Sequence, residues 1–290
     1  MSTPTSNPPE RTPDAAQTSP NKTTIFNRLP TRALLAIVTL VFVVGWLLNT
    51  PPGLEGKADA VGYAICHQIV ERSFAVNGQP IALCARCTGM YLGAMIAMAY
   101  QLFLGRRRSE WPGKGMLVVL GVFFLAFALD GTNSAAKLFL GHDLLYTPNN
   151  TLRLITGTGM GIAMGVMVQP TFNQTLWKNY DPRPYFMSWK SFAGMLAVEA
   201  AVVLMVLSEK PFFLIPFSYI SAAGVVIFLV LLYSMILMVI FDHENKIEKT
   251  ADYLPWMLGG ILVAFMHIGG VDYLRYLITG TWEGFSLHLG

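Results

Sequence analysis

The sequence predicts an all-α protein, a polytopic membrane bundle of about seven transmembrane helices, and three observations lead to this class. Hydrophobic residues make up 53% of the 290 residues and charged residues only 13%, whereas soluble domains carry about 25% charge. The mean hydropathy is +0.49, and the apolar residues gather in blocks that approach the ~20 residues of a spanning helix. The ten-residue segments of alternating polarity that are typical of membrane β-barrels are absent. This composition excludes a soluble globular enzyme.

The apolar blocks are expected to be helices, because in lipid every backbone N–H and C=O must be bonded within its own segment. The blocks run over residues 32–49, 85–104, 114–130, 150–169, 191–208, 216–241 and 254–274. Residues 1–30, rich in proline, serine and threonine, are predicted to be a disordered cytoplasmic tail. The rest divides into residues 31–170, with helices one to four and the polar motifs, and residues 171–290, with helices five to seven.

The basic residues indicate how the bundle lies in the membrane, because short cytoplasmic loops are enriched in lysine and arginine. With seven crossings, the basic clusters of the loops fall on one side: Arg28, Arg32, Arg106, Arg107, Arg108, Lys114, Lys178, Arg183, Lys190, Lys246 and Lys249. We therefore expect a cytoplasmic N-terminus, an outer C-terminus and a place in the inner (plasma) membrane. The lipid bilayer is the expected partner, and the small net charge of +3 indicates no nucleic-acid partner.

All three cysteines lie in the first outer loop and at the start of the second helix. Cys66 and His67 come first, and Cys84 and Cys87 follow as a Cys-x-x-Cys pair whose spacing brings two sulfurs close together. Zinc favours four nitrogen and sulfur ligands in a tetrahedron, so these four residues are a candidate zinc site. Because adjacent side chains usually diverge, the adjacency of Cys66 and His67 argues for one ligand from that pair.

Two other interpretations of the cysteines remain open. In an oxidising outer compartment, two of them could form a reversible disulfide while the third stays free or acts as a resolving thiol. Alternatively, they are plain structural cysteines, paired or simply buried. The pattern does not identify a catalytic residue.

A second polar group is expected at the outer ends of helices three and four: Asp130, Asn133, Asn149, Asn150 and Arg153. The third helix is expected to end at Asp130, and Asn149 or Asn150 to cap the fourth by accepting a backbone N–H. Arg153 would lie one turn into the membrane, where an unpaired charge is costly, so we expect a buried pair with Asp130. The group is either a structural link between helices or a polar pocket for an anionic head group or substrate.

Glycines four residues apart predict which helices touch. Gly89 and Gly93 lie on the second helix, and Gly157, Gly161 and Gly165 on the fourth. Small residues at this spacing let helix backbones approach closely. Contact between helices two and four would bring the Cys-x-x-Cys pair near the outer end of helix four.

The run Cys-His-Gln, Arg-Ser-Phe and Leu-Cys-Ala-Arg-Cys-Thr-Gly-Met-Tyr-Leu-Gly resembles a family of bacterial and archaeal membrane proteins, domain of unknown function 2085. The family pattern continues as Asp-Gly, an Asn-rich step and Leu-Arg-Leu-x-Thr-Gly, which here are Asp130–Gly131, Asn149–Asn150 and Leu152–Gly157. The resemblance covers roughly residues 60–168 and brings no established activity. It implies that the Cys/His loop and the Asp/Asn/Arg step belong to one unit.

The sequence therefore indicates an integral membrane protein of uncharacterised activity, with an extracytoplasmic Cys/His metal or thiol site next to a polar pocket. Enzymatic activity is left open: a zinc-bound water could act as a nucleophile if one coordination position were free. Ionisable residues at membrane depth make a membrane transporter the alternative. The third possible class of function is an accessory subunit of a larger membrane complex, whose partners the sequence does not name.

Overall fold

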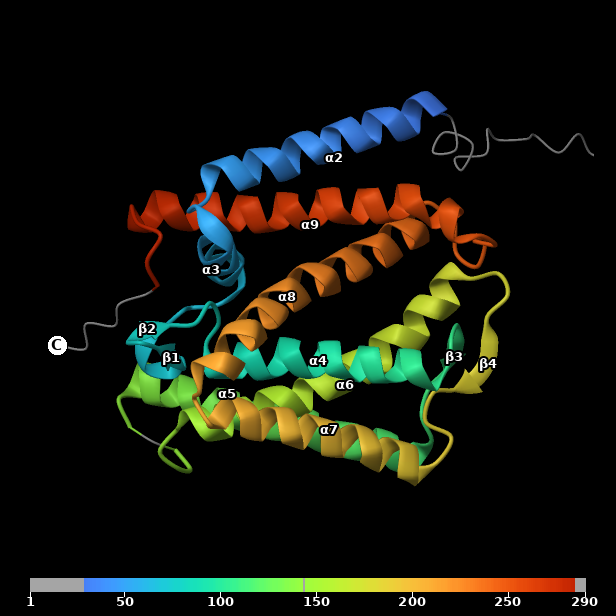
Figure 1. The fold of residues 1–290 in the computed structure, drawn as a ribbon. Coiled ribbons are helices and arrows are strands. Elements are labelled where there is room, and N and C mark those ends of the chain that lie inside the picture. The colour runs from blue at the N-terminus through green and yellow to red at the C-terminus, as the bar shows by residue number, and fades with distance from the viewer. Residues whose placement is uncertain (1–28, 143, 285–290) are drawn as a thin grey trace, which may run out of the picture.

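The computed structural model describes residues 29–142 and 144–284. Seven of the described helices are long and apolar enough to cross a membrane, which confirms the predicted fold class. They alternate in direction between two ends of the molecule (Figure 1). Their bounds are α2 (Leu29–Asn49), α4 (Ala85–Leu104), α5 (Lys114–Leu140), α6 (Asn150–Leu176), α7 (Trp189–Leu207), α8 (Pro211–Ile240) and α9 (Thr250–Thr279). The predicted disordered tail lies outside the described residues, apart from its last two positions, which begin α2.

The two ends of the bundle carry different chemistry. At one end, which we call the basic end, the loops 105–113, 177–188 and 241–249 come together. There β3 (Arg108–Glu110) pairs in parallel with β4 (Asp181–Pro184), and the backbone N–H of Lys178 donates to the carbonyl of Ile247 over 3.0 Å. The opposite end, which we call the thiol end, holds a short helix α3 (Gly53–Ile65), the 3₁₀ turn η1 (Val70–Arg72) and a hairpin of β1 (Ala75–Val76) and β2 (Gln79–Pro80).

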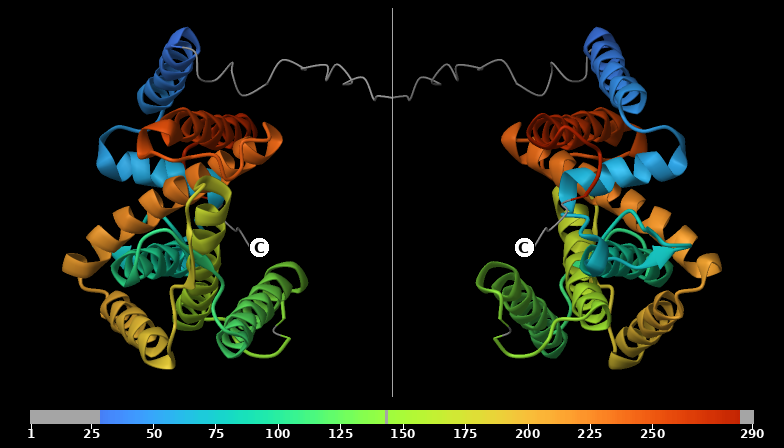
Figure 2. Two further views of the ribbon diagram at one scale, coloured as in Figure 1. Left: turned by 90° about the vertical axis from the view of Figure 1, so that its right-hand side faces the viewer. Right: turned by 90° about the vertical axis from the view of Figure 1, so that its left-hand side faces the viewer.

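The helices are arranged around one central pair, α4 and α6. Helix α8 packs against α4, α9 packs against α8, and α2 lies outermost against α9 (Figure 2). Helices α5 and α7 flank the central pair on the other side. Because α4 and α6 both begin at the thiol end, they are parallel, and both N-termini lie there.

The central pair is held at backbone contact by glycines. A Cβ added to Gly157 would lie 2.2 Å from the carbonyl oxygen of Arg86, and one added to Gly161 would lie 2.1 Å from that of Met90. From the other helix, a Cβ on Gly89 would lie 2.4 Å from the carbonyl oxygen of Leu154. The predicted close packing of these two helices is therefore confirmed, and any side chain at these glycines would push the backbones apart.

The outer helices present apolar surface, as a lipid environment requires. Leu40 on α2 is 62% exposed, Phe124 on α5 is 52% exposed and Leu204 on α7 is 68% exposed. In water such a surface would be unfavourable, whereas lipid tails match it. The chain is thus a membrane protein whose immediate partner is the bilayer.

The expected boundaries are wrong at one functionally important place. Helix α5 does not end at Asp130 but continues to Leu140 and stops at Gly141, whose φ of 74° gives a left-handed end. The Asp130 carboxylate is neutralised by Arg86, so it can remain inside a helix without facing lipid as a bare charge. Helix α3 was not expected, because its sequence is too short and too polar to span a membrane.

The close contact between α4 and α6 predicts that a glycine-to-alanine substitution will destabilise the protein inside the contact but not outside it. Gly161→Ala should lower the thermal unfolding midpoint in detergent, because the added methyl overlaps backbone, and overpacking costs about 1–3 kcal/mol. Gly121→Ala on α5 is the matched control: its Cβ would meet nothing within 4 Å, and alanine favours helix over glycine by about 1 kcal/mol. Equal shifts of the two midpoints would refute close backbone contact as the organising feature.

Candidate functional site

The three cysteines are brought together from two separate segments. Cys66 follows the last residue of α3, while Cys84 precedes α4 and Cys87 lies in its first turn. Their sulfur atoms all lie within 4.8 Å of one another. All three are free thiols, and Cys66 is only 4% exposed. We call these residues the thiol cluster; three sulfurs this close are a group that could hold a metal ion.

The loop around Cys66 is shaped to receive the other two thiols. The backbone N–H groups of Gln68 and Cys84 both point at the Cys66 sulfur, each over 3.4 Å. Gln68 has a φ of 51°, which turns the chain sharply after Cys66. Its side-chain amide donates to the carbonyl oxygens of Asp59, over 2.9 Å, and Ala82, over 3.0 Å. One glutamine therefore ties α3 to the segment that leads into α4.

A residue far along the chain completes this support. Arg275, near the end of α9, donates from Nη1 to the carbonyl oxygens of Tyr63 and Cys66 over 2.6 and 2.8 Å. Its Nη2 donates to the carbonyl of His67 over 3.3 Å, and its guanidinium lies 3.9 Å from the centre of the Tyr63 ring. Because a guanidinium offers a fixed fork of donors, it can hold these three backbone carbonyls at once. The thiol cluster thus depends on a contact from α9.

His67 does not join the thiol cluster. It is exposed, and its side chain is not among the ligand atoms that gather with the three sulfurs. Cys66 points inward and its neighbour outward, which is the divergence expected of adjacent residues. The four-ligand Cys3His arrangement that the sequence suggested is therefore not assembled in the structure, whereas its three cysteines are.

The three thiols perturb one another. Hydrogen bonds from the thiols of Cys66 and Cys87 hold the pKa of the Cys84 thiol well below its usual range. The hydrogen bond that Cys66 makes with Cys84 raises the pKa of Cys66 to about 11. Cys84 also stands at the N-terminus of α4, where the helix dipole favours negative charge. The cluster therefore favours a thiolate at Cys84 that its neighbours stabilise.

Asp130 forms a buried ion pair, but not with the expected partner. Arg86 of α4 donates from Nε to Asp130 Oδ2 over 3.0 Å, and its Nη2 contacts the same oxygen. Tyr146 donates its hydroxyl to Oδ1 over 2.7 Å. The side chain of Arg153 instead donates to Asn150 Oδ1 over 2.8 Å. The predicted Arg153–Asp130 pair is therefore wrong, because Asp130 is bound by Arg86 and the Arg153 side chain is held by Asn150.

Each of the three asparagines of the polar group forms hydrogen bonds that hold the local backbone in place. Asn149 caps α6, as expected, by accepting the backbone N–H of Leu152 over 2.9 Å. Asn133 is 1% exposed and its Oδ1 accepts the backbone N–H of Leu145 over 2.9 Å, which fixes the loop between α5 and α6. Asn150 donates to the carbonyl of Glu71 over 3.3 Å while accepting from Arg153. Asn150 therefore links α6 to the η1 segment of the cysteine loop.

Next to the thiol cluster lies a cavity of about 230 Å³, which we call the arginine pocket. Three arginines converge on it, and Cys84 belongs to its lining as well as to the thiol cluster. Of the five residues expected to form a polar pocket, Arg153 alone lines this one. The lining residues are His67, Ile69, Arg72, Cys84, Arg86, Gly131, Ser134, Ala135, Leu138, Phe139 and Arg153.

Sequence reasoning missed Arg72 and Arg86, although a signal for Arg86 was present. Arg86 is the second residue of α4, so it stands at the edge of a membrane helix. The cost of an unpaired charge at that depth, which singled out Arg153, applies equally to Arg86. For Arg72 no such signal existed, because it lies in a loop whose course the sequence does not reveal.

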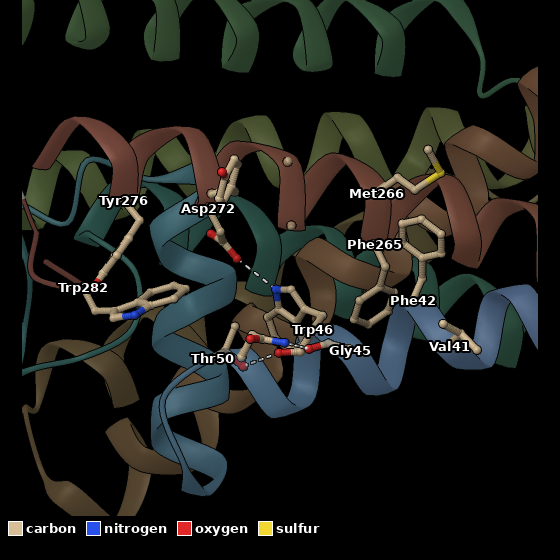
Figure 3. A pocket seen from close by; sticks show the side chains of 14 residues that line it. Val41, Phe42, Gly45, Trp46, Thr50, Phe265, Met266, Asp272, Tyr276 and Trp282 are labelled. Carbon is tan, nitrogen blue, oxygen red and sulfur yellow. Dashed lines mark hydrogen bonds between the residues drawn. The ribbon is translucent and has the colours of Figure 1, made fainter. Parts of the chain in front are cut away.

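A larger cavity, of about 630 Å³, lies between α2 and α9 (Figure 3). Its lining is mostly apolar and aromatic, with Phe42, Phe265 and Met266 prominent. The indole N–H of Trp46 donates to Asp272 Oδ2 over 2.9 Å. This cavity offers a single carboxylate and no cluster of metal ligands or nucleophiles. Among the described residues, the thiol end is therefore the stronger candidate for chemistry.

Comparison with known proteins connects this site to a family. A family model described as a predicted membrane protein, domain of unknown function 2085, matches residues 66–167. An uncharacterized protein of Methanocaldococcus jannaschii is 32% identical over 122 residues, which cover 42% of this chain and 72% of that protein. An uncharacterized protein of Methanothermobacter thermautotrophicus is 30% identical over 105 residues, covering 36% of this chain and 85% of that protein. No solved structure matches the chain significantly.

The ion pair predicts a pattern of single and double substitutions. Arg86→Gln should strongly reduce the amount of folded protein, because stranding a buried carboxylate costs about 3–5 kcal/mol. Combining it with Asp130→Asn should recover part of the loss, since neither charge is then unpaired. Thermal unfolding in detergent measures both effects.

Arg183→Gln at the basic end is the matched control, because it removes an arginine from an exposed pair with Asp181 and should leave the midpoint unchanged. A double variant no more stable than Arg86→Gln alone would show that these two side chains do not form a structural pair.

Proposed function

The chain belongs to the family of predicted membrane proteins named domain of unknown function 2085, and we propose that it binds a thiophilic metal ion, zinc in the first instance, through Cys66, Cys84 and Cys87. The observation that carries this proposal is the mutual approach of the three sulfurs to within 4.8 Å. Zinc–sulfur bonds of about 2.3 Å in a tetrahedron separate sulfurs by about 3.8 Å, so a small contraction would close the site.

The surroundings of the sulfurs support thiolate ligands. Two backbone N–H groups already point at Cys66, and the α4 N-terminus lies under Cys84 and Cys87. Both features stabilise negative charge on sulfur, and soft thiolates select zinc or copper(I) over magnesium or calcium. A static structural disulfide would use only two of the three sulfurs.

Three protein ligands leave one coordination position of a tetrahedral metal for another group. Structural zinc sites are closed by four protein ligands, whereas catalytic sites keep one position for water or substrate. A metal held here would polarise whatever occupies that position. Cys84 also lines the arginine pocket, so that pocket is the natural approach to the metal.

We further propose that the site faces the extracytoplasmic side of the inner (plasma) membrane. The loops of the basic end carry the clustered charges, and such loops favour the cytoplasm. The thiol end is opposite them along the same helices, so it would lie outside. The residues that support this orientation are Arg106, Arg107, Arg108, Lys178, Arg183, Lys246 and Lys249.

A thiol–disulfide function is the second candidate, and one observation favours it. Cys84 and Cys87 form a Cys-x-x-Cys pair at a helix N-terminus, and the pKa of Cys84 is held low by hydrogen bonds from its two thiol neighbours. A low-pKa thiolate in that position is the attacking group of dithiol oxidoreductases. Under this alternative Cys66 would be the resolving thiol.

Elemental analysis of the purified protein separates the two candidates. We expect about one zinc ion per chain, lost in each single variant Cys66→Ser, Cys84→Ser and Cys87→Ser, because each removes one of only three ligands. His67→Ala is the matched control and should retain the metal, since His67 lies outside the cluster. Metal-free protein with a disulfide after purification in air would favour the thiol–disulfide function instead.

Orientation is tested by labelling intact cells with a membrane-impermeant maleimide. After mild reduction and chelation, the cysteines of the thiol cluster should react without opening the cell. In a cysteine-free background, Lys178→Cys at the basic end should react only after the membrane is permeabilised. The reverse pattern would place the thiol cluster in the cytoplasm and contradict the proposed orientation.

A further inference from the structure

The arginine pocket has more positive charge than its buried carboxylates neutralise. Arg72 comes from η1, Arg86 from α4 and Arg153 from α6, so three separate elements bring guanidinium groups to one cavity. Asp130 is the buried carboxylate here, and Arg86 already binds it. The neighbouring Glu71 is exposed, so solvent screens its charge. Two guanidinium groups therefore remain without a buried carboxylate as partner.

Arg153 is the clearest sign that a ligand belongs in this pocket. The residue is 7% exposed, and its Nη1 donates to Asn150. Its Nε is buried and finds no hydrogen-bond acceptor among the residues that the structure describes. A buried donor without an acceptor is costly, and a charged one more so. An anionic acceptor in the pocket would remove that cost.

Arg72 and the two helix ends strengthen the positive potential. Burial first, and then the nearby charge of Arg86, lower the pKa of the Arg72 guanidinium, while Cys84, Glu71 and Asp130 raise it by smaller amounts. The hydrogen bond from Arg72 Nη2 to the Ser134 carbonyl is long, at 3.4 Å. Because α4 and α6 are parallel, the positive ends of both helix dipoles lie at this same end. Three like charges and two helix N-termini therefore lie together at one cavity, and an anion bound there would offset their repulsion.

We propose that the arginine pocket binds a phosphate group or an equivalent tetrahedral oxyanion. Guanidinium groups match phosphate oxygens in paired hydrogen bonds, which explains why arginines rather than lysines converge here. The cavity of about 230 Å³ is smaller than the about 300–1,000 Å³ of drug-sized sites, so it fits a head group rather than a whole lipid. Leu138 and the 82% exposed Phe139 form an apolar side, beside which an acyl chain could lie.

This inference goes beyond metal binding, and the two can fail separately. The arginines could instead serve only to balance thiolate charge, since Cys84 shares the pocket. In that case their removal would release metal, and phosphate would have no effect on the protein. If the pocket binds an oxyanion by itself, phosphate binding should persist in a Cys87→Ser protein that has lost its metal, because Cys87 does not line the pocket.

The experiment measures the thermal unfolding midpoint of the full-length protein in detergent as inorganic phosphate is added at constant ionic strength, with chloride as the reference salt. Phosphate should raise the midpoint in a saturable manner, because a ligand that binds only the folded state stabilises it. Arg153→Gln and Arg72→Gln should each weaken the apparent affinity about ten- to a hundredfold, the loss of one charge-assisted contact. Arg183→Gln at the basic end should behave as the wild type.

A second measurement identifies the source of the phosphate group. Native mass spectrometry compares retention of phosphatidic acid and phosphatidylcholine by the same variants. Phosphatidic acid retained by the wild type and lost in Arg153→Gln would assign the pocket to a lipid head group, whereas stabilisation by inorganic phosphate alone would assign it to a soluble oxyanion. Should Arg153→Gln fail to fold, Arg72→Gln on the loop gives the same comparison.

Three results would overturn the proposal. The first is a wild-type protein that neither inorganic phosphate stabilises nor phosphatidic acid binds. The second is unchanged binding in a folded Arg153→Gln or Arg72→Gln protein. The third is phosphate binding that disappears together with the metal in Cys87→Ser, because the anion would then be a ligand of the metal and not of the arginines.

Discussion

The backbone contact between α4 and α6 is the constraint on which the rest of the thiol end depends. Carbonyl oxygens of one helix lie where a Cβ of the other would be, at Gly157 and Gly161 on α6 and at Gly89 on α4. These contacts hold Gly157 of α6 beside Arg86 of α4, so they fix the relative position of the two parallel helices along their axes. The Cys-x-x-Cys turn of α4 therefore stands beside the second turn of α6, and loops from α3 and α5 close over both.

The low dielectric constant near the membrane explains why charged side chains gather in pairs and groups at the thiol end. Charges near the edge of a membrane are tolerated only with partners, so they collect where several elements can supply them. Arg86 and Asp130 neutralise each other, Asn150 supports Arg153, and Arg275 holds the backbone of the Cys66 loop. Residues from α9, beyond the region that the family model matches, therefore contribute to the geometry of the cysteines.

The sequence was sufficient for what depends on composition and spacing. Hydropathy located the seven spans found among the described residues, and glycine spacing identified the central helix pair. The asparagine before α6 was recognisable as a cap because its short side chain can accept a backbone N–H. These features depend on local sequence, so they do not require knowledge of distant contacts.

What depends on distant contacts could not be predicted. Asp130 looked like a helix end because its neutralising partner, Arg86, lies 44 residues away. Arg153 was the expected partner because it lies in the first turn of a membrane helix at the thiol end. Arg86 lies in the same position on α4, so position in the helix alone does not distinguish the two arginines. His67 looked like a ligand by its place next to Cys66, but only the turn at Gln68 decides which of the two side chains faces inward. The Asn77-Gly78 turn, with both residues at positive φ, is a hairpin signal that could have been recognised.

The central claim is that three sulfurs, and no histidine, hold a metal with one position left for another group. X-ray absorption spectroscopy at the zinc edge of the purified, zinc-loaded protein tests it most directly. The account predicts about three sulfurs at about 2.3 Å and one oxygen or nitrogen at about 2.0–2.2 Å, with a spectrum unchanged by His67→Ala. A first shell that loses a nitrogen ligand in His67→Ala, or one with fewer than three sulfurs, would contradict it.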